Sequence, residues 1–287
     1  MAMTRGIEYA LGAMLFFGLG DLIYKRGAAA GAPAHHFLMV QAWVFAPSVV
    51  LYALLTGSLR FVAGSLWGAL AGLFVLVGFY NFAHSLKSGS ISINAPVFRL
   101  SFVLTATLAV LLLGEPLTPC KLGGIALALA AAWLLLGAPA PGDAAGRREG
   151  RSSLVRVLVA TVSVGIANFI YTFGLRAGAT PASLIIAQAA VVVTLATVFA
   201  GTVDRRIRPS AEALRHAPRA ALVLALAFAC MVESMARAQA SIVVPIAQMG
   251  FVVTAVLGFL FLREPFTARK GAGIAAALGA LASLAHG

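Results

Sequence analysis

The chain alternates long apolar runs with short polar breaks, and the runs have the length of membrane-spanning helices. The hydrocarbon core of a bilayer is about 30 Å thick, so a helix needs roughly 20 apolar residues to cross it. The first part of the chain contains five such runs, at Ile7–Tyr24, Phe37–Leu55, Leu66–Leu86, Ile91–Leu113 and Leu122–Leu136. The second part contains five more, at Leu154–Leu175, Ala182–Val203, Ala221–Met235, Ile242–Leu262 and Gly271–Leu284. We therefore predict an all-α, polytopic membrane protein of ten transmembrane helices.

The two sets of runs are separated by a segment rich in Pro, Gly and charge, residues 137–153. Such a segment does not continue an apolar helix and is not stable in hydrocarbon. We therefore divide the chain into a first five-helix repeat at residues 1–136, a linker at 137–153 and a second repeat at 154–287. The N-terminal run resembles a cleavable signal, but because it recurs in the second half we expect it to be a permanent helix.

An internal repeat is the strongest signal in the sequence. Residues 92–137 align without a gap on residues 241–286 at an offset of 149, and 21 of 46 positions are identical. An offset of 147 aligns the first helix with the sixth and the second with the seventh, and its matched pairs are Gly18 with Gly165, Asp21 with Asn168, Tyr24 with Tyr171, and Gln41 with Gln188. So extensive a match exceeds what shared Ala and Leu content produces and indicates duplication.

Each predicted repeat has an odd number of spans, so the second repeat enters the bilayer with the opposite orientation. Inverted repeats of this kind are typical of secondary transporters, whose binding site lies near the midplane between the two halves. The fold therefore suggests transport by alternating access, as an argument from architecture.

The composition agrees with a membrane protein and excludes a soluble domain. Hydrophobic residues make up 61% of the 287 residues and charged residues 10%, whereas soluble domains have roughly 45–50% and 25%. The net charge of +12 comes from short basic tracts between apolar runs, which predicts positive-inside anchoring and no nucleic-acid partner. Cys120 and Cys230 form neither a CxxC pair nor part of a histidine cluster, so we expect no disulfide, metal or cofactor.

Two segments carry a resemblance to a known family. The stretch LLLGEPLTPCKLGGIALALAAAWLLL and its echo FLFLREPFTARKGAGIAAALGALASL resemble the ends of EamA-type repeats in the drug/metabolite transporter superfamily. The resemblance implies ten helices in two repeats and the movement of amino acids, nucleotide-linked or other metabolites, or drugs, usually by export or exchange. The sequence FGLGD at residues 17–21 departs from many relatives, which have a Trp-Gly pair there and no acid.

Ionisable residues inside the spans are candidates for function, because each costs a few kcal/mol in hydrocarbon unless it faces a cavity or a partner. Arg99 lies about eight residues into the fourth predicted helix, where a guanidinium binds a carboxylate or phosphate bidentately; the alternative is a structural ion pair. Glu233 aligns with His84 in the repeat, and either group is a candidate proton carrier. The alternative for Glu233 is an intrahelical pair with Arg237.

Polar and aromatic residues at repeated positions complete the candidate set. Asp21 is a candidate ligand group or the i,i+4 partner of Lys25, and tyrosines near it are suited to stacking on a planar or cationic solute, or to ordinary packing. The repeated glutamines, Gln41 and Gln188, are expected either to line a cavity or to join helices through hydrogen bonds. The predicted substrate-binding residues are Asp21, Tyr24, Gln41, Tyr80, His84, Arg99, Asn168, Tyr171, Gln188, Glu233 and Gln248.

These residues favour a secondary carrier for a small polar or amphipathic metabolite, such as an amino acid, that is exchanged against protons or another solute. Export of drugs or organic cations is the alternative, and flipping of a lipid-linked sugar is a further one. An enzyme is disfavoured, because no HExxH, GxSxG, CxxC or Walker-type motif is present.

The basic residues also predict an orientation. Outside the fourth helix, 15 Lys and Arg lie in the odd-numbered connections and five on the other side. The positive-inside rule then places the odd connections in the cytoplasm and both termini outside a cell membrane, which we expect to be a bacterial inner membrane.

Overall fold

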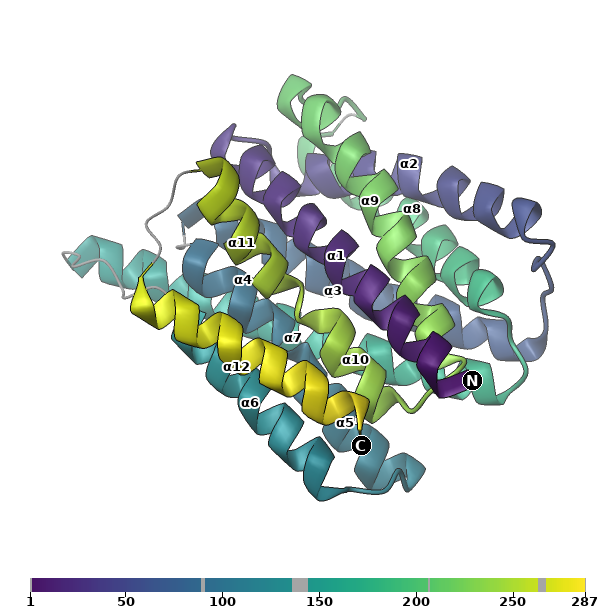
Figure 1. Ribbon diagram of the computed structural model, residues 1–287. Coiled ribbons are helices and arrows are strands. Elements are labelled where there is room, and N and C mark those ends of the chain that lie inside the picture. Colours follow the sequence, from purple (N-terminus) through teal and green to yellow (C-terminus); the bar gives the residue numbers. More distant parts are fainter. Residues whose placement is uncertain (1, 89–90, 136–143, 206, 263–266, 287) are drawn as a thin grey trace.

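The computed structural model describes residues 2–88, 91–135, 144–205, 207–262 and 267–286, and every element within these ranges is helical (Figure 1). The first half contains α1 (Ala2–Ala29), α2 (Ala34–Leu55), the short 3-10 helix η1 (Ala63–Ser65), α3 (Leu66–Ser88), α4 (Ile91–Arg99), α5 (Ser101–Leu113) and α6 (Pro119–Leu135). The second half contains α7 (Ala144–Arg176), α8 (Pro181–Asp204), α9 (Ala211–Met235), α10 (Ala240–Gln248), α11 (Gly250–Leu262) and α12 (Ala268–Ala285).

Six of these helices are long and apolar enough to cross a membrane, and they correspond to α1, α2, α3 with η1, α7, α8 and α9. Four shorter apolar segments, at Val97–Leu113, Pro119–Leu134, Ala240–Thr254 and Gly271–Ala285, occupy the places of the other predicted spans. Helix length alone therefore identifies six spans, and the total of ten remains a prediction.

Two predicted helices are each broken in two, which the apolar pattern does not indicate. The run Ile91–Leu113 is divided at Leu100 into α4 and α5, and the run Ile242–Leu262 is divided at Met249 into α10 and α11. At each break the backbone tightens to i→i−3 hydrogen bonds, from Leu100 N to Val97 O and from Met249 N to Ile246 O, both 3.1 Å. Because the breaks are 149 residues apart, they are equivalent points of the repeat.

Proline precedes each break by four residues, at Pro96 in α4 and Pro245 in α10. Proline cannot donate the i→i−4 hydrogen bond and crowds the preceding turn, so it weakens a helix where it stands. The repeated prolines therefore mark matched interruptions, and discontinuous helices of this kind often border the binding sites of transporters.

Other boundaries differ from the sequence-based expectation mainly at polar ends. The helix α7 begins at Ala144, within the segment predicted to be a non-helical linker, and α9 begins at Ala211, ten residues before the predicted start. Ala, Arg and Glu are good helix formers, and their charges are tolerated in water beyond the apolar core. Apolar runs reveal the part of a helix inside the membrane and not its polar extension.

The two halves exchange their first helices. The helix α1 of the first half packs against α9, α10 and α11, whereas α7 of the second half packs against α3, α4 and α5 (Figure 1). The helices α6 and α12 pack against each other. Each repeat therefore packs its first helix against helices of the other repeat.

Small residues allow α1 and α11 to cross closely. A Cβ added to Gly18 would lie 2.5 Å from Val253 Cβ and 2.6 Å from Gly250 O. The hydroxyl of Thr254 donates to Gly18 O at 3.0 Å, and its repeat mate Thr105 donates to the carbonyl of Gly165 at the same distance. Close helix crossings through small residues with added hydroxyl hydrogen bonds are typical of packing in membranes.

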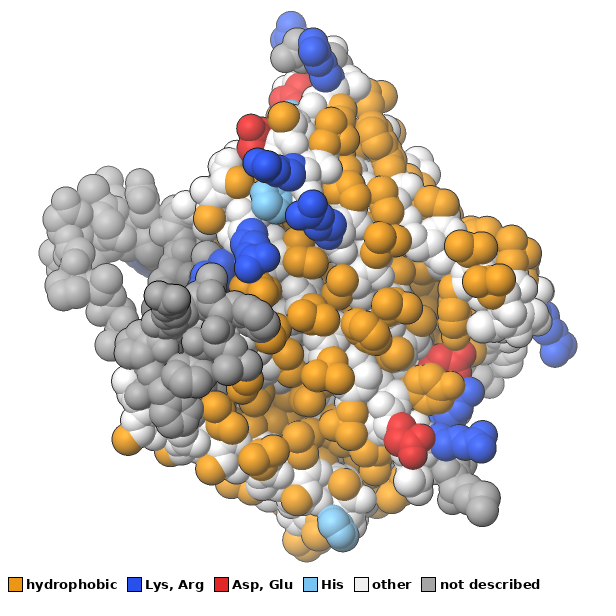
Figure 2. Space-filling model, turned by 45° about the horizontal axis from the view of Figure 1, so that its top comes forward, with side chains coloured by type: hydrophobic (Ala, Val, Ile, Leu, Met, Phe, Trp, Pro, Cys, Tyr) orange, Lys and Arg blue, Asp and Glu red, His pale blue; other side chains and the backbone are white. Residues whose placement is uncertain are grey.

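The surface is apolar over a broad central zone. Figure 2 shows hydrophobic side chains across the middle of one face, with charged side chains gathered toward its upper and lower right ends. Exposed large residues include Leu55, Leu66, Leu111 and Trp133, each more than 60% exposed. Such a zone is expected for a protein solvated by lipid tails.

We predict that Gly18→Ala destabilises the protein, because the new methyl group meets backbone and side-chain atoms that cannot move apart freely. The expected loss is about 1–3 kcal/mol, the usual range for overpacking, and it is measured as a lower melting temperature in detergent. The matched control is Gly279→Ala, whose added Cβ lies 3.4 Å from Leu127 Cδ1 in ordinary contact. Equal melting temperatures for the two variants would show that the crossing tolerates a side chain.

Candidate functional site

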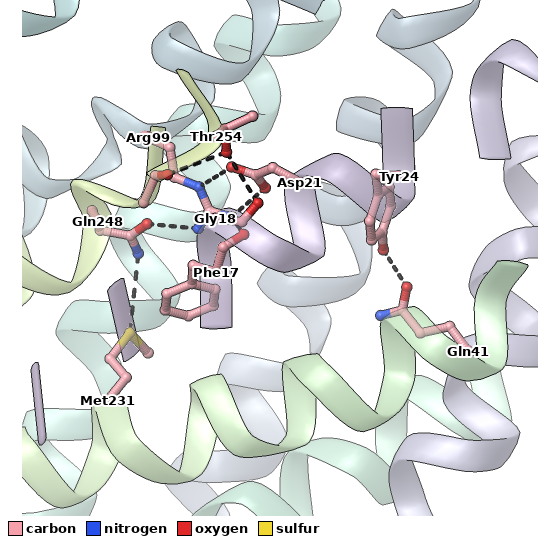
Figure 3. A network of polar contacts seen from close by, with 10 residues as sticks. Phe17, Gly18, Asp21, Tyr24, Gln41, Arg99, Met231, Gln248 and Thr254 are labelled. Carbon is pink, nitrogen blue, oxygen red and sulfur yellow. Dashed lines mark hydrogen bonds and ion pairs between the residues drawn. The ribbon is translucent and has the colours of Figure 1, made fainter. Parts of the chain in front are cut away.

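A buried ion pair joins α1 to α4 at the break between α4 and α5 (Figure 3). Arg99 Nε donates to Asp21 Oδ2 at 3.0 Å, and Arg99 Nη2 donates to the other carboxylate oxygen. Arg99 is 1% exposed and Asp21 5%. A two-point contact of this kind fixes both side chains, because the planar guanidinium matches the carboxylate geometrically.

The same guanidinium reaches into the second half of the chain. Arg99 Nη1 donates to Gln248 Oε1 at 3.0 Å, and Gln248 is the last residue of α10 before its break. The guanidinium carbon also lies 4.5 Å from the ring centre of Phe17 and 5.3 Å from that of Phe98. The charge is thus shared among a carboxylate, an amide and two ring faces, which compensates for its removal from water.

The second repeat has no ion pair at the equivalent positions. Asp21 is matched by Asn168 and Arg99 by Gln248, so neutral amides replace both charges. Asn168 is 1% exposed, and its Nδ2 has no hydrogen-bond partner among the described residues. The ion pair is therefore an asymmetric feature on a symmetric scaffold.

Two tyrosine–glutamine pairs, in contrast, follow the repeat closely. The Tyr24 hydroxyl of α1 donates to Gln41 Oε1 of α2, and the Tyr171 hydroxyl of α7 donates to Gln188 Oε1 of α8. Tyr24 and Asp21 lie on one helix but contact different partners, as Figure 3 shows. Within the described part of the chain neither amide nitrogen, Gln41 Nε2 or Gln188 Nε2, makes a hydrogen bond.

Both glutamines line one cavity between the halves. Helices α2, α3, α8 and α9 enclose it, and its lining residues are Leu38, Gln41, Ala42, Phe45, Val75, Phe79, Gln188, Ala189, Val192 and Phe228. Its volume is about 20 Å³, which is room for about one water molecule. Two amides therefore face a narrow, otherwise apolar space that is too small for a metabolite.

Aromatic rings separate this cavity from the ion pair. Phe228, which lines the cavity, makes edge contacts with Phe17 at 5.7 Å and with Phe45 at 5.7 Å. Phe79 packs on Phe98 at 5.5 Å. Since Phe17 and Phe98 also contact the Arg99 guanidinium, a movement of the rings and a movement of the ion pair are mechanically linked.

The remaining predicted site residues lie elsewhere. Tyr80 and His84 contact each other on α3 at 5.9 Å between ring centres, and Tyr80 also packs on Phe199. Glu233, near the end of α9, forms the i,i+4 pair with Arg237, which lies just beyond that helix, and accepts a hydrogen bond from the Tyr52 hydroxyl at 2.9 Å. Neither group borders the cavity of Gln41 and Gln188.

Two polar contacts were not predicted from the sequence. The carboxylate of Glu115 accepts hydrogen bonds from the backbone N–H groups of Ala240 and Ser241, at 3.2 and 2.9 Å, and so caps the start of α10. A negative group at a helix N-terminus is stabilising. The repeated Glu-Pro dipeptide was the available signal, although it does not reveal the partner. The second contact joins His35 and His36 to Asp204.

We predict that Asp21→Asn strongly destabilises the protein, because it leaves the Arg99 charge buried without a counterion. Breaking a buried pair costs about 3–5 kcal/mol. The double variant Asp21→Asn/Arg99→Gln should recover much of this loss, since Asn and Gln are the residues that the second repeat carries at these positions. Thermal unfolding of the two variants in detergent provides the comparison.

The control is Glu233→Gln, which breaks a pair whose arginine side chain is 34% exposed. Such a partly exposed pair is worth about 1 kcal/mol or less. If the double variant is as unstable as Asp21→Asn alone, an unpaired Arg99 charge is not the cause of the destabilisation, and the prediction is wrong.

Comparison with known proteins identifies the family. No curated protein matches the sequence. One solved structure, described only as "Crystal structure of protein", is 17% identical to the chain with a TM-score of 0.74, and the match covers 98% of this chain and 96% of the other. At that identity the likeness shows the fold. The model of the EamA-like transporter family matches twice, at residues 4–137 and 151–285. The chain therefore belongs to the EamA-like transporter family, within the drug/metabolite transporter superfamily, and is a multi-pass membrane protein built from two EamA repeats.

Proposed function

We propose that the protein is a secondary transporter that moves a small amphipathic metabolite, with amino acids as the favoured class, by alternating access. The observation that carries this proposal is the pair of glutamines that face one cavity from opposite repeats. Each amide oxygen is engaged by a tyrosine hydroxyl, so each side chain is oriented with its N–H groups available. Two oriented donors suit a carboxylate or carbonyl group of a solute.

The rest of the cavity suits an apolar portion of the same solute. Its walls include the rings of Phe45, Phe79 and Phe228 and the side chains of Val75 and Val192. An apolar pocket with a few oriented polar groups is the usual form of a small-molecule site. The rings also offer faces for the ammonium group of a zwitterion.

The charges near the cavity favour a neutral or zwitterionic solute over an organic cation. Asp21 is paired with Arg99, and Glu233 with Arg237. Neither carboxylate borders the cavity, so a cation would find no unpaired acid there. We assign the ion pair of Asp21 and Arg99 to positioning α1, α4 and α10 around the site.

The cavity is too small for a metabolite, so transport requires the helices around it to move. The helices α2 and α8 carry the two glutamines and come from different repeats. If they part at one end while they stay in contact at the other, the cavity opens toward one side of the membrane at a time. The bias of basic residues supports a cytoplasmic position for the connection between α1 and α2 and for that between α8 and α9. Both termini then lie on the side of the membrane opposite the cytoplasm.

We predict that Gln41→Leu and Gln188→Leu each reduce solute flux without unfolding the protein. Loss of one hydrogen bond to a charged group is worth about 1.5–3 kcal/mol, so uptake should fall by about 10- to 100-fold. The measurement is the initial rate of counterflow of radiolabelled amino acids in proteoliposomes. Retention of a monodisperse peak in gel filtration confirms folding.

The matched control is Thr194→Val, a polar-to-apolar change on α8 less than two turns from Gln188. Thr194 is exposed, and its hydroxyl donates only to Ala190 O of its own helix. Its flux should equal that of the wild type. Unchanged flux in both glutamine variants would place the substrate elsewhere, and absence of counterflow for every amino acid would remove them as substrates.

A further inference from the structure

Two histidines and an aspartate converge where the start of α2 meets the end of α8. His35 Nε2 lies 3.2 Å from Asp204 Oδ2, and His36 Nε2 contacts the same oxygen. One ligand atom from each of the three residues lies within 4.8 Å of the others. Imidazole nitrogens and a carboxylate oxygen are the ligands that Zn²⁺ and similar transition-metal ions prefer.

We propose that His35, His36 and Asp204 form a binding site for a divalent transition-metal ion of the Zn²⁺ type. In a tetrahedral zinc site the protein ligand atoms lie about 2.0–2.2 Å from the ion and hence about 3.3 Å from one another. The separation of His35 Nε2 and Asp204 Oδ2, 3.2 Å, is close to this value. Three protein ligands leave the fourth position for water or a small anion.

The surroundings suit an ion that enters from water. The side chains of His35, His36 and Asp204 are 18%, 13% and 27% exposed. They are therefore partly withdrawn from solvent, which strengthens their interaction with a cation, yet an entry path remains. The site offers two imidazoles and one carboxylate, so harder ions such as Mg²⁺ and Ca²⁺, which prefer several oxygen ligands, should bind poorly.

The cluster is not a by-product of the repeat. At the offset of 147, His35 and His36 correspond to Ala182 and Ser183, and Asp204 corresponds to Gly57. The equivalent junction at the other end of α2 and α8 is held by hydroxyl groups. Thr180 Oγ1 donates to Ser58 O at 2.9 Å and Ser65 Oγ donates to Ser183 Oγ at 3.0 Å. Ligand-forming residues occur at one end only.

An ion at this position would tie the two halves together. His35 and His36 belong to the first repeat and Asp204 to the second. Gln41 lies five residues beyond His36 on α2, about 8 Å along the helix, so the tie would hold together one of the two ends of α2 and α8 that flank the cavity. Any effect of this tie on transport rests on the proposed function, whereas binding of the ion does not.

The test is a calorimetric titration of ZnCl₂ into purified, chelator-treated protein in detergent. We expect one equivalent to bind to the wild type, and the affinity to fall at least about tenfold in His35→Ala and in Asp204→Asn. The control His286→Ala removes an exposed histidine at the end of α12 and should bind as the wild type does. Titration with MgCl₂ should give no heat of binding.

X-ray absorption of the zinc-loaded wild type gives a second test that needs no variant. Two imidazole nitrogens with oxygen neighbours are expected around the ion. The proposal is overturned if the wild type binds no zinc, if His35→Ala and Asp204→Asn bind it unchanged, or if the spectrum shows sulfur or fewer than two imidazoles. If the wild type binds zinc but transports no amino acid, the proposed function is contradicted and the zinc site is not.

Discussion

A guanidinium buried within a helical bundle must be neutralised in place, and the arrangement around Arg99 follows from that constraint. The carboxylate of Asp21, the amide of Gln248 and the faces of Phe17 and Phe98 supply the interactions that water would otherwise provide. These groups come from α1, α4 and α10, so the charge fixes three helices from both repeats with respect to one another. The cost of moving any of them away is the cost of a buried, unpaired charge. Separation of these three helices at this point is therefore opposed by that cost.

The broken helices give the ion pair its position. Arg99 is the last residue of α4 and Gln248 the last residue of α10, so the two side chains that meet stand at equivalent helix ends. The repeat explains why there are two breaks, since each lies four residues after its proline. It also explains why the tyrosine–glutamine pairs are duplicated. Only the first repeat, however, carries charged residues at these positions, Asp21 and Arg99. The two repeats therefore share a backbone arrangement but differ in charge.

Much of this organisation could be predicted from the sequence, because duplication and apolar length are local signals. The two repeats and the correspondence of residues between them follow from the offsets of 147 and 149, and the family from the resemblance of the segment around Glu115 and of its echo in the second repeat. The apolar runs give no sign of the breaks at Leu100 and Met249, since such a run looks the same whether its helix is straight or interrupted, and the sequence signal for matched kinks is the repeated proline, Pro96 and Pro245. Nor could the partners of Arg99: spacing suggested a pairing of Asp21 with Lys25, and only the fold brings Arg99, 78 positions away, to that carboxylate. Contacts such as that of His36 with Asp204 join different repeats, for which sequence spacing carries no information.

The contacts at the two ends of the helix pair α2 and α8 differ, and this difference bears on how the inward-facing and outward-facing states are balanced. At one end hydroxyl groups of Thr180, Ser65 and Ser183 make neutral hydrogen bonds, which exchange readily with water at small net cost. At the other end imidazoles meet a carboxylate, so the strength of the contact depends on the charge or the ion that it holds. The two contacts share no residue, so breaking one does not in itself break the other. A carrier with a neutral contact at one end and an ionisable contact at the other can have its inward and outward states biased separately, which symmetric repeats alone would not allow.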